Sequence, residues 1–166
     1  KILKNNLVKF NYQDMSKSGN VDANFINKDD YLLYHAAWWT DKLPNDKNVF
    51  TVAAHGGSDG VIVDERFEYK SGINLTPKEL FEIINKYPDF EKAETIDLKV
   101  CYSGFSPYKK QSFAQTLANL SGKKVIGYTG EYRYNVLPIF NKHDLDTKSK
   151  QILFYPQKSI TNETKN

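Results

Sequence analysis

Hydrophobic and polar positions along the chain follow patterns that predict strands and helices in alternation. Three apolar stretches have the length and pattern of strands buried in a sheet, at residues 49–54, 96–100 and 124–128. Apolar residues at helical spacing predict helices at residues 29–41, 76–87 and 113–122. In α/β domains such helices connect parallel strands and cover the faces of the sheet. We therefore predict an α/β fold with a mostly parallel central sheet.

Two of these helices have clear boundary signals. Thr76 is a helix-capping residue, followed by Pro77 at the first helical position and by Glu79 three residues on, as in a capping box. Gly122 is expected to end the third helix.

The other segments carry weaker patterns. They predict an edge strand at residues 1–12, a loop at 13–24, a strand or small hairpin at 61–69 and a last strand at 151–155. Residues 159–166 are expected to form a flexible tail, so that residues 1–158 make up a single domain.

The composition fits one domain that folds by itself. The 166 residues are 40% hydrophobic and include 10 Phe, 11 Tyr and 2 Trp, which is enough to fill a core. The single cysteine excludes an intramolecular disulfide and a zinc ribbon. No apolar run approaches the roughly 20 residues of a membrane-spanning helix, so we expect a soluble protein without a membrane partner. The chain begins with Lys1 rather than methionine, so we expect a piece excised from a longer protein, with artificial trimming of the sequence as the alternative.

The charge gives little support to nucleic-acid binding. The net charge is +3, from 23 basic and 20 acidic side chains, and the only arginines are Arg66 and Arg133. Nucleic-acid sites favour arginine, because its guanidinium binds bases and phosphates with two hydrogen bonds. Nucleic acid is therefore an unexpected partner.

Two residues with catalytic chemistry, His55 and Cys101, come directly after predicted strands. Ligand sites of parallel sheets lie at the carboxyl ends of the strands, so these two side chains could meet at one edge. A histidine beside a cysteine makes the thiol a nucleophile, because the imidazole stabilises the thiolate and lowers the thiol pKa. The sequence thus predicts a Cys-His dyad that attacks a carbonyl group, with no metal.

Small residues follow both candidates. Gly56 and Gly57 would let a substrate backbone approach the histidine, and Ser103 and Gly104 belong to a turn with backbone N–H groups. The N–H of Cys101, with that of Gly56 or Gly57, would form an oxyanion hole.

Each candidate also has an ordinary structural explanation. A free cysteine is often a small buried hydrophobe at the end of a core strand, and a histidine in a turn is often bonded to backbone alone. Of the other histidines, His35 is expected to pack within an aromatic helix and His143 to lie in a polar loop.

The two strand ends resemble those of the caspase-like (clan CD) cysteine peptidases. Residues 49–57 are similar to the apolar strand and His-Gly turn of that family, and residues 96–104 to its nucleophile strand and turn. The order and spacing of His55 and Cys101 agree as well. This resemblance, which extends from residue 49 to about residue 133, implies a caspase-like three-layer sandwich and a cysteine endopeptidase.

Two branches of the family are most similar. One is the self-cleaving cysteine protease domain of large bacterial toxins of the RTX and clostridial types, which has close analogues of residues 75–80 and 110–115. The other is the CHAT group, which shares the Cys-Tyr-Ser-Gly turn. We favour the toxin branch, which implies an autoprocessing or effector domain of a larger secreted bacterial protein acting in the target-cell cytosol. The expected partners are a polypeptide substrate, including the parent chain in cis, and an inhibitor or immunity protein.

The toxin branch implies two further features that this chain matches incompletely. An upstream aspartate orients the histidine there, and the candidates here are Asp14, Asp22, Asp29 and Asp30, none of them in a matching motif. Inositol hexakisphosphate is the allosteric activator of that branch, and the corresponding basic residues here are Arg133, Lys142, Lys148 and Lys150. A solvated lysine-rich surface is the alternative explanation for those charges.

Two other functions fit the sequence. One is a non-peptidase toxin or effector module, such as a nuclease or a Cys-His transferase, because a fold does not determine a function. The other is a catalytically inactive relative that only binds, in which Cys101 and His55 are packing residues.

Overall fold

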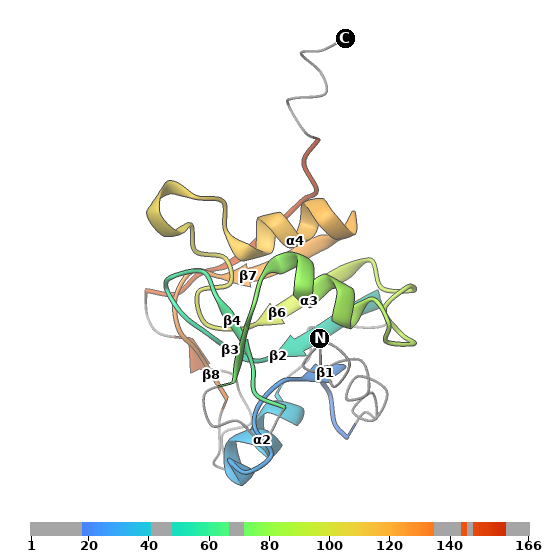
Figure 1. The fold of residues 1–166 in the computed structure, drawn as a ribbon, viewed down its shortest axis with the longest axis vertical. Coiled ribbons are helices and arrows are strands. Elements are labelled where there is room, and N and C mark those ends of the chain that lie inside the picture. Colours follow the sequence, from blue (N-terminus) through green and yellow to red (C-terminus); the bar gives the residue numbers. More distant parts are fainter. Residues whose placement is uncertain (1–17, 41–47, 67–71, 135–143, 146–147, 159–166) are drawn as a thin grey trace.

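A computed structural model of the chain describes residues 18–40, 48–66, 72–134, 144–145 and 148–158. These residues form a mixed α/β fold around a five-stranded sheet (Figure 1). In spatial order the strands are β1 (Ala23–Asn24), β2 (Val49–Ala53), β6 (Thr95–Lys99), β7 (Lys124–Tyr128) and β10 (Gln151–Phe154). The first four are parallel, and β10 runs antiparallel to β7. The predicted α/β fold with a mostly parallel sheet is confirmed.

Smaller sheets branch off after β2 and after β7 within the described residues. β3 (His55–Gly56), β4 (Ile62–Asp64) and β5 (Ile73–Leu75) form an antiparallel sheet directly after β2. β8 (Tyr132–Arg133) follows β7 and pairs with β9 (Asp144–Leu145). The strand that is one of the two alternatives predicted for residues 61–69 is present as β4, and its antiparallel partners β3 and β5 lie outside that segment.

The three predicted helices are all present in the described part of the chain. They are α2 (Tyr31–Trp38), α3 (Pro77–Ile84) and α4 (Phe113–Ser121), with a short 3-10 turn, η2 (Pro107–Lys109), before α4. α3 begins with the expected capping box: the Glu79 N–H donates to Thr76 Oγ1 at 3.2 Å, and the Thr76 N–H donates to Glu79 Oε1 at 3.0 Å. α4 ends at Gly122, which has a left-handed φ of 71°.

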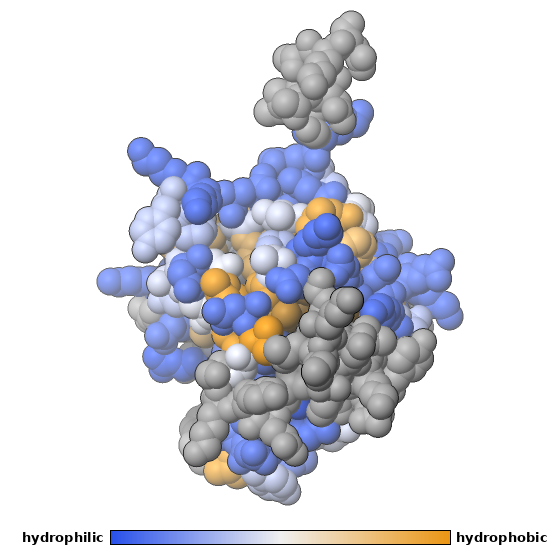
Figure 2. Space-filling model, viewed as in Figure 1, coloured by the Kyte–Doolittle hydropathy of each residue, from blue (hydrophilic) through white to orange (hydrophobic). Residues whose placement is uncertain are grey.

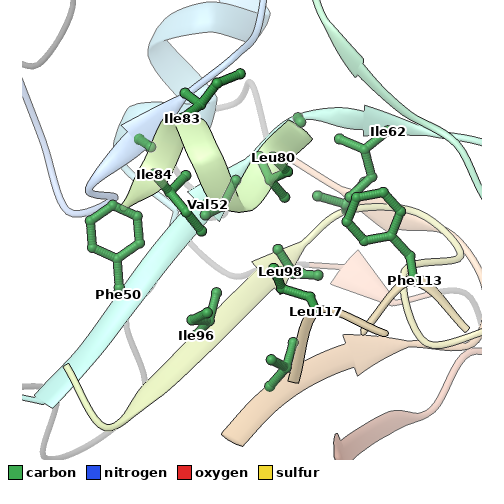
Figure 3. Packing of buried hydrophobic residues seen from close by; sticks show 14 of the residues in the cluster. Phe50, Val52, Ile62, Leu80, Ile83, Ile84, Ile96, Leu98, Phe113 and Leu117 are labelled. Atoms are coloured by element: carbon green, nitrogen blue, oxygen red, sulfur yellow. The ribbon is translucent and has the colours of Figure 1, made fainter. Parts of the chain in front are cut away.

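The larger hydrophobic core lies between the sheet and the helices α3 and α4 (Figure 3). Its strand residues include Phe50, Val52, Ile96 and Leu98, and its helix residues include Leu80, Ile84, Phe113 and Leu117. On the opposite face of the sheet, a second core joins Ala53 and Tyr128 to Ala37 and Trp38 of α2. Helices therefore cover both faces of the sheet.

The alternation of side chains along the strands decides which face each candidate residue meets. Successive residues of a strand point to opposite faces, so Phe50 and Val52 enter the larger core while Ala53 faces α2. Cys101, beyond β6, also packs against the α2 core. The candidate nucleophile thus lies on the α2 side of the sheet.

One face of the molecule is drawn by hydropathy in Figure 2. Figure 2 shows hydrophilic residues over most of the face in view and an apolar area in its middle, where β4 and β5 lie in Figure 1. Partly buried Ile73 of β5 and Phe81 of α3 pack against the larger core. No helix among the described residues is long and apolar enough to cross a membrane.

The amino-terminal part differs from the prediction. The loop expected at residues 13–24 is wrong at its end, where Ala23 and Asn24 form β1. A strand of two residues leaves no hydrophobic pattern, and this one is stabilised by distant partners: Asp22 donates its N–H to the Thr51 carbonyl at 2.9 Å, and the Thr51 N–H donates to the Asp22 carboxylate at 2.8 Å. The edge strand predicted at residues 1–12 and the tail at 159–166 lie outside the described residues.

Candidate active site at the ends of β2 and β6

His55 and Cys101 occupy equivalent positions after two neighbouring parallel strands. Ala53 of β2 pairs with Lys99 of β6, and each candidate follows its paired residue by two positions. The two chain segments stay in contact beyond the sheet, because a Cβ added to Gly56 would lie 2.6 Å from the Cys101 carbonyl oxygen. The structure therefore brings the two candidates to the same edge, as the sequence predicts.

Gly56 and Gly57 have a different role from the expected one. The space that a side chain at Gly56 would fill is taken by Cys101 and Val100, and the space at Gly57 is taken by the Asp59 carboxylate. The missing side chain at Gly56 thus lets two segments of this chain approach each other, rather than leaving room for a substrate.

The Tyr134 hydroxyl connects the ends of β2 and β6. Its hydroxyl accepts a hydrogen bond from the Ala54 N–H at 2.9 Å and also contacts the carbonyl oxygens of Ala54 and Lys99. Burial raises the pKa of this hydroxyl well above its ordinary value, and the neighbouring Tyr132 adds to the rise. Tyr134 therefore fixes the backbone one residue before His55 and two residues before Cys101.

The turn after Cys101 is held in a strained conformation by its own backbone. Tyr102 has a left-handed φ of 59°, which a tyrosine adopts only when its surroundings enforce it. The N–H groups of Tyr102, Ser103 and Gly104 donate to the carbonyls of Gly130, Val100 and Tyr128. The Ser103 hydroxyl is buried and donates to the Leu98 carbonyl. Ser103 and Gly104 thus stabilise the turn and have no N–H left for an oxyanion.

The remaining donors for an oxyanion are the N–H groups of Cys101 and Gly56. The Gly57 N–H donates to the Val61 carbonyl at 3.1 Å. Alternate pairs of an antiparallel ladder are hydrogen-bonded, so the intervening Gly56 N–H points away from β4. Within the described part of the chain, the Cys101 N–H also donates to no carbonyl.

The Cys101 thiol is half-buried and bonded to β8. It donates to the Tyr132 carbonyl at 3.3 Å and accepts from the Tyr132 N–H at 3.2 Å. Burial raises the pKa of the thiol and Glu131 raises it further, while the Tyr132 N–H, the N–H of Cys101 itself and Arg133 lower it. The net shift is upward, opposite to the lowered thiol pKa that the sequence predicts.

A carboxylate that the sequence analysis did not select lies next to His55. Glu65 Oε1 is 3.6 Å from His55 Nε2, and the two side chains are 19% and 45% exposed. Burial raises the pKa of Glu65, His55 lowers it, and the negative charges of Asp30 and Asp64 raise it further. The nearest acid therefore follows the histidine in the sequence.

The expected upstream aspartates have other places. Asp22 accepts a hydrogen bond from the Thr51 backbone, Asp29 and Asp30 lie exposed just before α2, and Asp14 is outside the described residues. Knowledge of how residues 61–69 pair with the segment after β2 would have identified Glu65. His55 pairs with Val63, and this pairing places Glu65 on the same face as His55.

The basic residues expected to bind a polyanion lie near the carboxyl ends of β7 and β8. Arg133 is exposed and pairs with Glu131 at 2.9 Å. Lys148 and Lys150 are exposed on the segment before β10, and Lys142 is outside the described residues. Of the other histidines, His35 is exposed but makes edge-to-face ring contacts with Tyr31 and Tyr34, and His143 is outside the described residues.

A cavity of about 330 Å³ adjoins the Cys101 turn through Gly104. Its other lining residues include Lys109, Lys110, Gln115 and Phe154, and neither His55 nor Cys101 is among them. Among the described residues, no three His, Cys, Asp or Glu side chains gather as metal ligands.

Comparison with known proteins identifies the family. The chain belongs to a family described as a domain of unknown function (DUF8616), which matches residues 21–143. The match includes both His55 and Cys101. A search of curated proteins and a search of solved structures find no match.

Proposed function

We propose that this domain is a cysteine peptidase of the caspase-like type, with Cys101 as the nucleophile and His55 as the general base. The observation that carries the proposal is the contact at Gly56, where the segment that begins with His55 meets the Cys101 carbonyl. A nucleophile and its base must lie within reach of each other before any other catalytic requirement matters. The parallel sheet with helices on both faces is compatible with the three-layer sandwich that the resemblance implies.

In the proposed reaction, His55 removes the Cys101 proton and the thiolate attacks a peptide carbonyl. The N–H groups of Cys101 and Gly56 stabilise the oxyanion. His55 then gives its proton to the departing amine, which leaves an acyl-enzyme. Water, deprotonated by His55, attacks the acyl carbon, and the carboxylic acid leaves as the thiol regains its proton. A polypeptide is the substrate, and the parent chain in cis is the first candidate.

The raised pKa of Cys101 defines the resting state in this proposal. A thiol whose pKa is raised keeps its proton at neutral pH, so the thiolate forms only when His55 takes the proton during the reaction. The bonds of the thiol to Tyr132 must also open before the sulfur can attack a substrate. We therefore expect turnover to be slow unless the substrate induces a rearrangement of β8.

The proposal is tested with a peptide library derived from a digested proteome. The wild-type protein should cleave a subset of peptides at defined positions, and Cys101→Ala and His55→Ala should each abolish that cleavage without loss of the fold. The double variant should lose no more activity than the single variants, because the two residues act as one unit. Equal cleavage by Cys101→Ala would assign the activity to another site or to a contaminant.

A binding relative without catalysis is the second candidate, and the Tyr132 contacts favour it. A half-buried thiol that both donates to and accepts from one backbone residue is satisfied as a structural group. Alkylation with iodoacetamide distinguishes the two functions. If the domain is a peptidase, alkylation of Cys101 should be slower in His55→Ala than in the wild type. If Cys101 is a structural thiol, the two proteins should be alkylated at equal rates at each pH from acidic to alkaline.

A further inference from the structure

The pairing of β3 with β4 holds Glu65 beside His55. His55 pairs with Val63, and directly opposed residues of antiparallel strands place their side chains on the same face. Glu65 lies two residues beyond Val63, so its side chain returns to that face as a diagonal neighbour of His55. This register, rather than chance orientation of a long side chain, accounts for the 3.6 Å between Glu65 Oε1 and His55 Nε2.

The backbone of Glu65 is also tied to the end of β2. The Glu65 N–H donates to the Phe25 carbonyl at 2.9 Å, and the Phe25 N–H donates to the Ala53 carbonyl at 2.8 Å. Phe25 thus connects Glu65 to the residue two positions before His55. The relative positions of Glu65 and His55 are thus fixed by the β3–β4 pairing and by the hydrogen bonds through Phe25.

The neighbouring arginine, Arg66, forms its salt bridge with Asp64. Arg66 donates to both carboxylate oxygens of Asp64, at 2.9 Å and 2.8 Å, and this salt bridge is buried. Glu65 Oε1 is itself buried and accepts no hydrogen bond from the described residues. A buried carboxylate oxygen is costly unless it has a partner, and the group within reach is the His55 imidazole.

We propose that Glu65 is the positioning residue of this site, holding the proton of neutral His55 on Nε2 so that Nδ1 is the atom that removes the Cys101 proton. The inference rests on the proposed peptidase function for its role in catalysis. The tautomer of a histidine is set by the bond that its other nitrogen makes. A distance of 3.6 Å is longer than a hydrogen bond, and catalytic contacts often shorten only when substrate binds.

The tautomer can be measured without any substrate. Nitrogen-15 chemical shifts of the His55 ring, recorded at a pH where the ring is neutral, should show the proton on Nε2 in the wild type. In Glu65→Gln the amide can also donate, so the Nδ1–H form should become appreciably populated. Glu82→Gln, the same change on the exposed face of α3, should leave the wild-type shifts unchanged.

A reciprocal measurement uses the carboxyl group of Glu65. His55 lowers the pKa of Glu65, so His55→Gln should raise that pKa in a carbon-13 titration, whereas His35→Gln should not. This variant leaves Glu65 in place and therefore keeps the inference testable if Glu65→Gln fails to fold. An unchanged Glu65 titration in His55→Gln, or an unchanged His55 tautomer in Glu65→Gln, would overturn the positioning role.

Peptide cleavage separates this inference from the proposed function. If both hold, Glu65→Gln should lower kcat by about 10–100-fold with little change in KM, as expected for a group that acts through the base. A shifted tautomer in a protein that cleaves no peptide would support the positioning role and contradict the peptidase. Full cleavage by Glu65→Gln would show that the Cys101–His55 pair works without Glu65.

Discussion

The ionisation of the Cys101 thiol decides how the candidate site can react. Burial raises the pKa of the thiol, and the groups that favour the thiolate are the Tyr132 N–H, the N–H of Cys101 itself and the Arg133 charge. Glu131, next to them in the sequence, acts in the opposite direction. Glu131 and Arg133, which lie on either side of Tyr132, therefore shift the pKa of the Cys101 thiol in opposite directions.

Substitution of these two charges should shift the thiol pKa in opposite directions. Glu131→Gln removes a negative charge that disfavours the thiolate, so the pKa of Cys101 should fall. Arg133→Gln removes a positive charge and leaves Glu131 without its ion-pair partner, so that pKa should rise. The midpoint of the alkylation rate against pH measures both shifts. Movement of the two midpoints in the same direction would contradict these assignments.

At the scale of elements, the site depends on the close approach of β3 to the end of β6. Gly56→Ala would place a methyl group 2.6 Å from the Cys101 carbonyl oxygen and 2.6 Å from Val100 Cγ1. One of the segments would have to move, at a cost of about 1–3 kcal/mol in the free energy of unfolding.

The adjacent glycine provides the matched control for this prediction. A Cβ at Gly57 meets the Asp59 carboxylate at 2.8 Å, and this side-chain end can rotate away. Urea unfolding should therefore show a larger loss for Gly56→Ala than for Gly57→Ala, and the alkylation profile of Cys101 should change only in the former. Equal losses for the two variants would mean that the contact with Cys101 does not constrain the site.

The elements that the sequence predicts correctly are those whose signals are local. The strands β2, β6 and β7 are marked by their own apolar residues, and α3 by its capping residue. α4 ends at Gly122, because a glycine readily adopts a left-handed φ. β1 and β8 are two residues long and exist because of distant partners, so no periodicity marks them.

The candidate site divides in the same way. His55 and Cys101 are visible in the sequence because each follows a strand. Glu65 becomes a neighbour of His55 only through the register of β3 and β4, and Tyr134 becomes part of the site only through a hydroxyl that reaches two strand ends. The raised thiol pKa depends on burial by β8, which no local pattern of the sequence reveals.

At the scale of the whole molecule, a buried polar network lies behind the site on the α2 side. The Tyr128 hydroxyl donates to Asp97 at 3.0 Å, and Asp97 pairs with Lys99 at 3.2 Å. The Lys99 ammonium lies 5.2 Å from the centre of the Tyr132 ring, whose hydroxyl bonds to Thr40 at 2.9 Å. These contacts connect β6, β7, β8 and the segment just after α2.

The buried tyrosines should make the folded protein sensitive to alkali. Burial raises the pKa of both Tyr128 and Tyr134, and the charge of Asp97 adds to the rise at Tyr128. In the unfolded chain tyrosine ionises near pH 10.0. Because the folded-state pKa is the higher one, the stabilisation is fully present below about pH 10 and is lost as the pH rises toward the folded-state value. The slope is up to about 1.4 kcal/mol per pH unit for each tyrosine.

Urea unfolding at a series of alkaline pH values measures this loss, and the absorbance of tyrosinate shows whether ionisation accompanies unfolding. Tyr128→Phe removes one of the two ionisable groups, so the free energy of unfolding should fall less steeply with pH, whatever its starting value. Tyr108→Phe is the control, because Tyr108 is 86% exposed. A slope that is the same in Tyr128→Phe and in the wild type would show that the Tyr128 hydroxyl ionises while the protein remains folded. The network around Asp97 would then be open to solvent on the timescale of the measurement, and it would not act as a fixed connection between β6, β7 and β8.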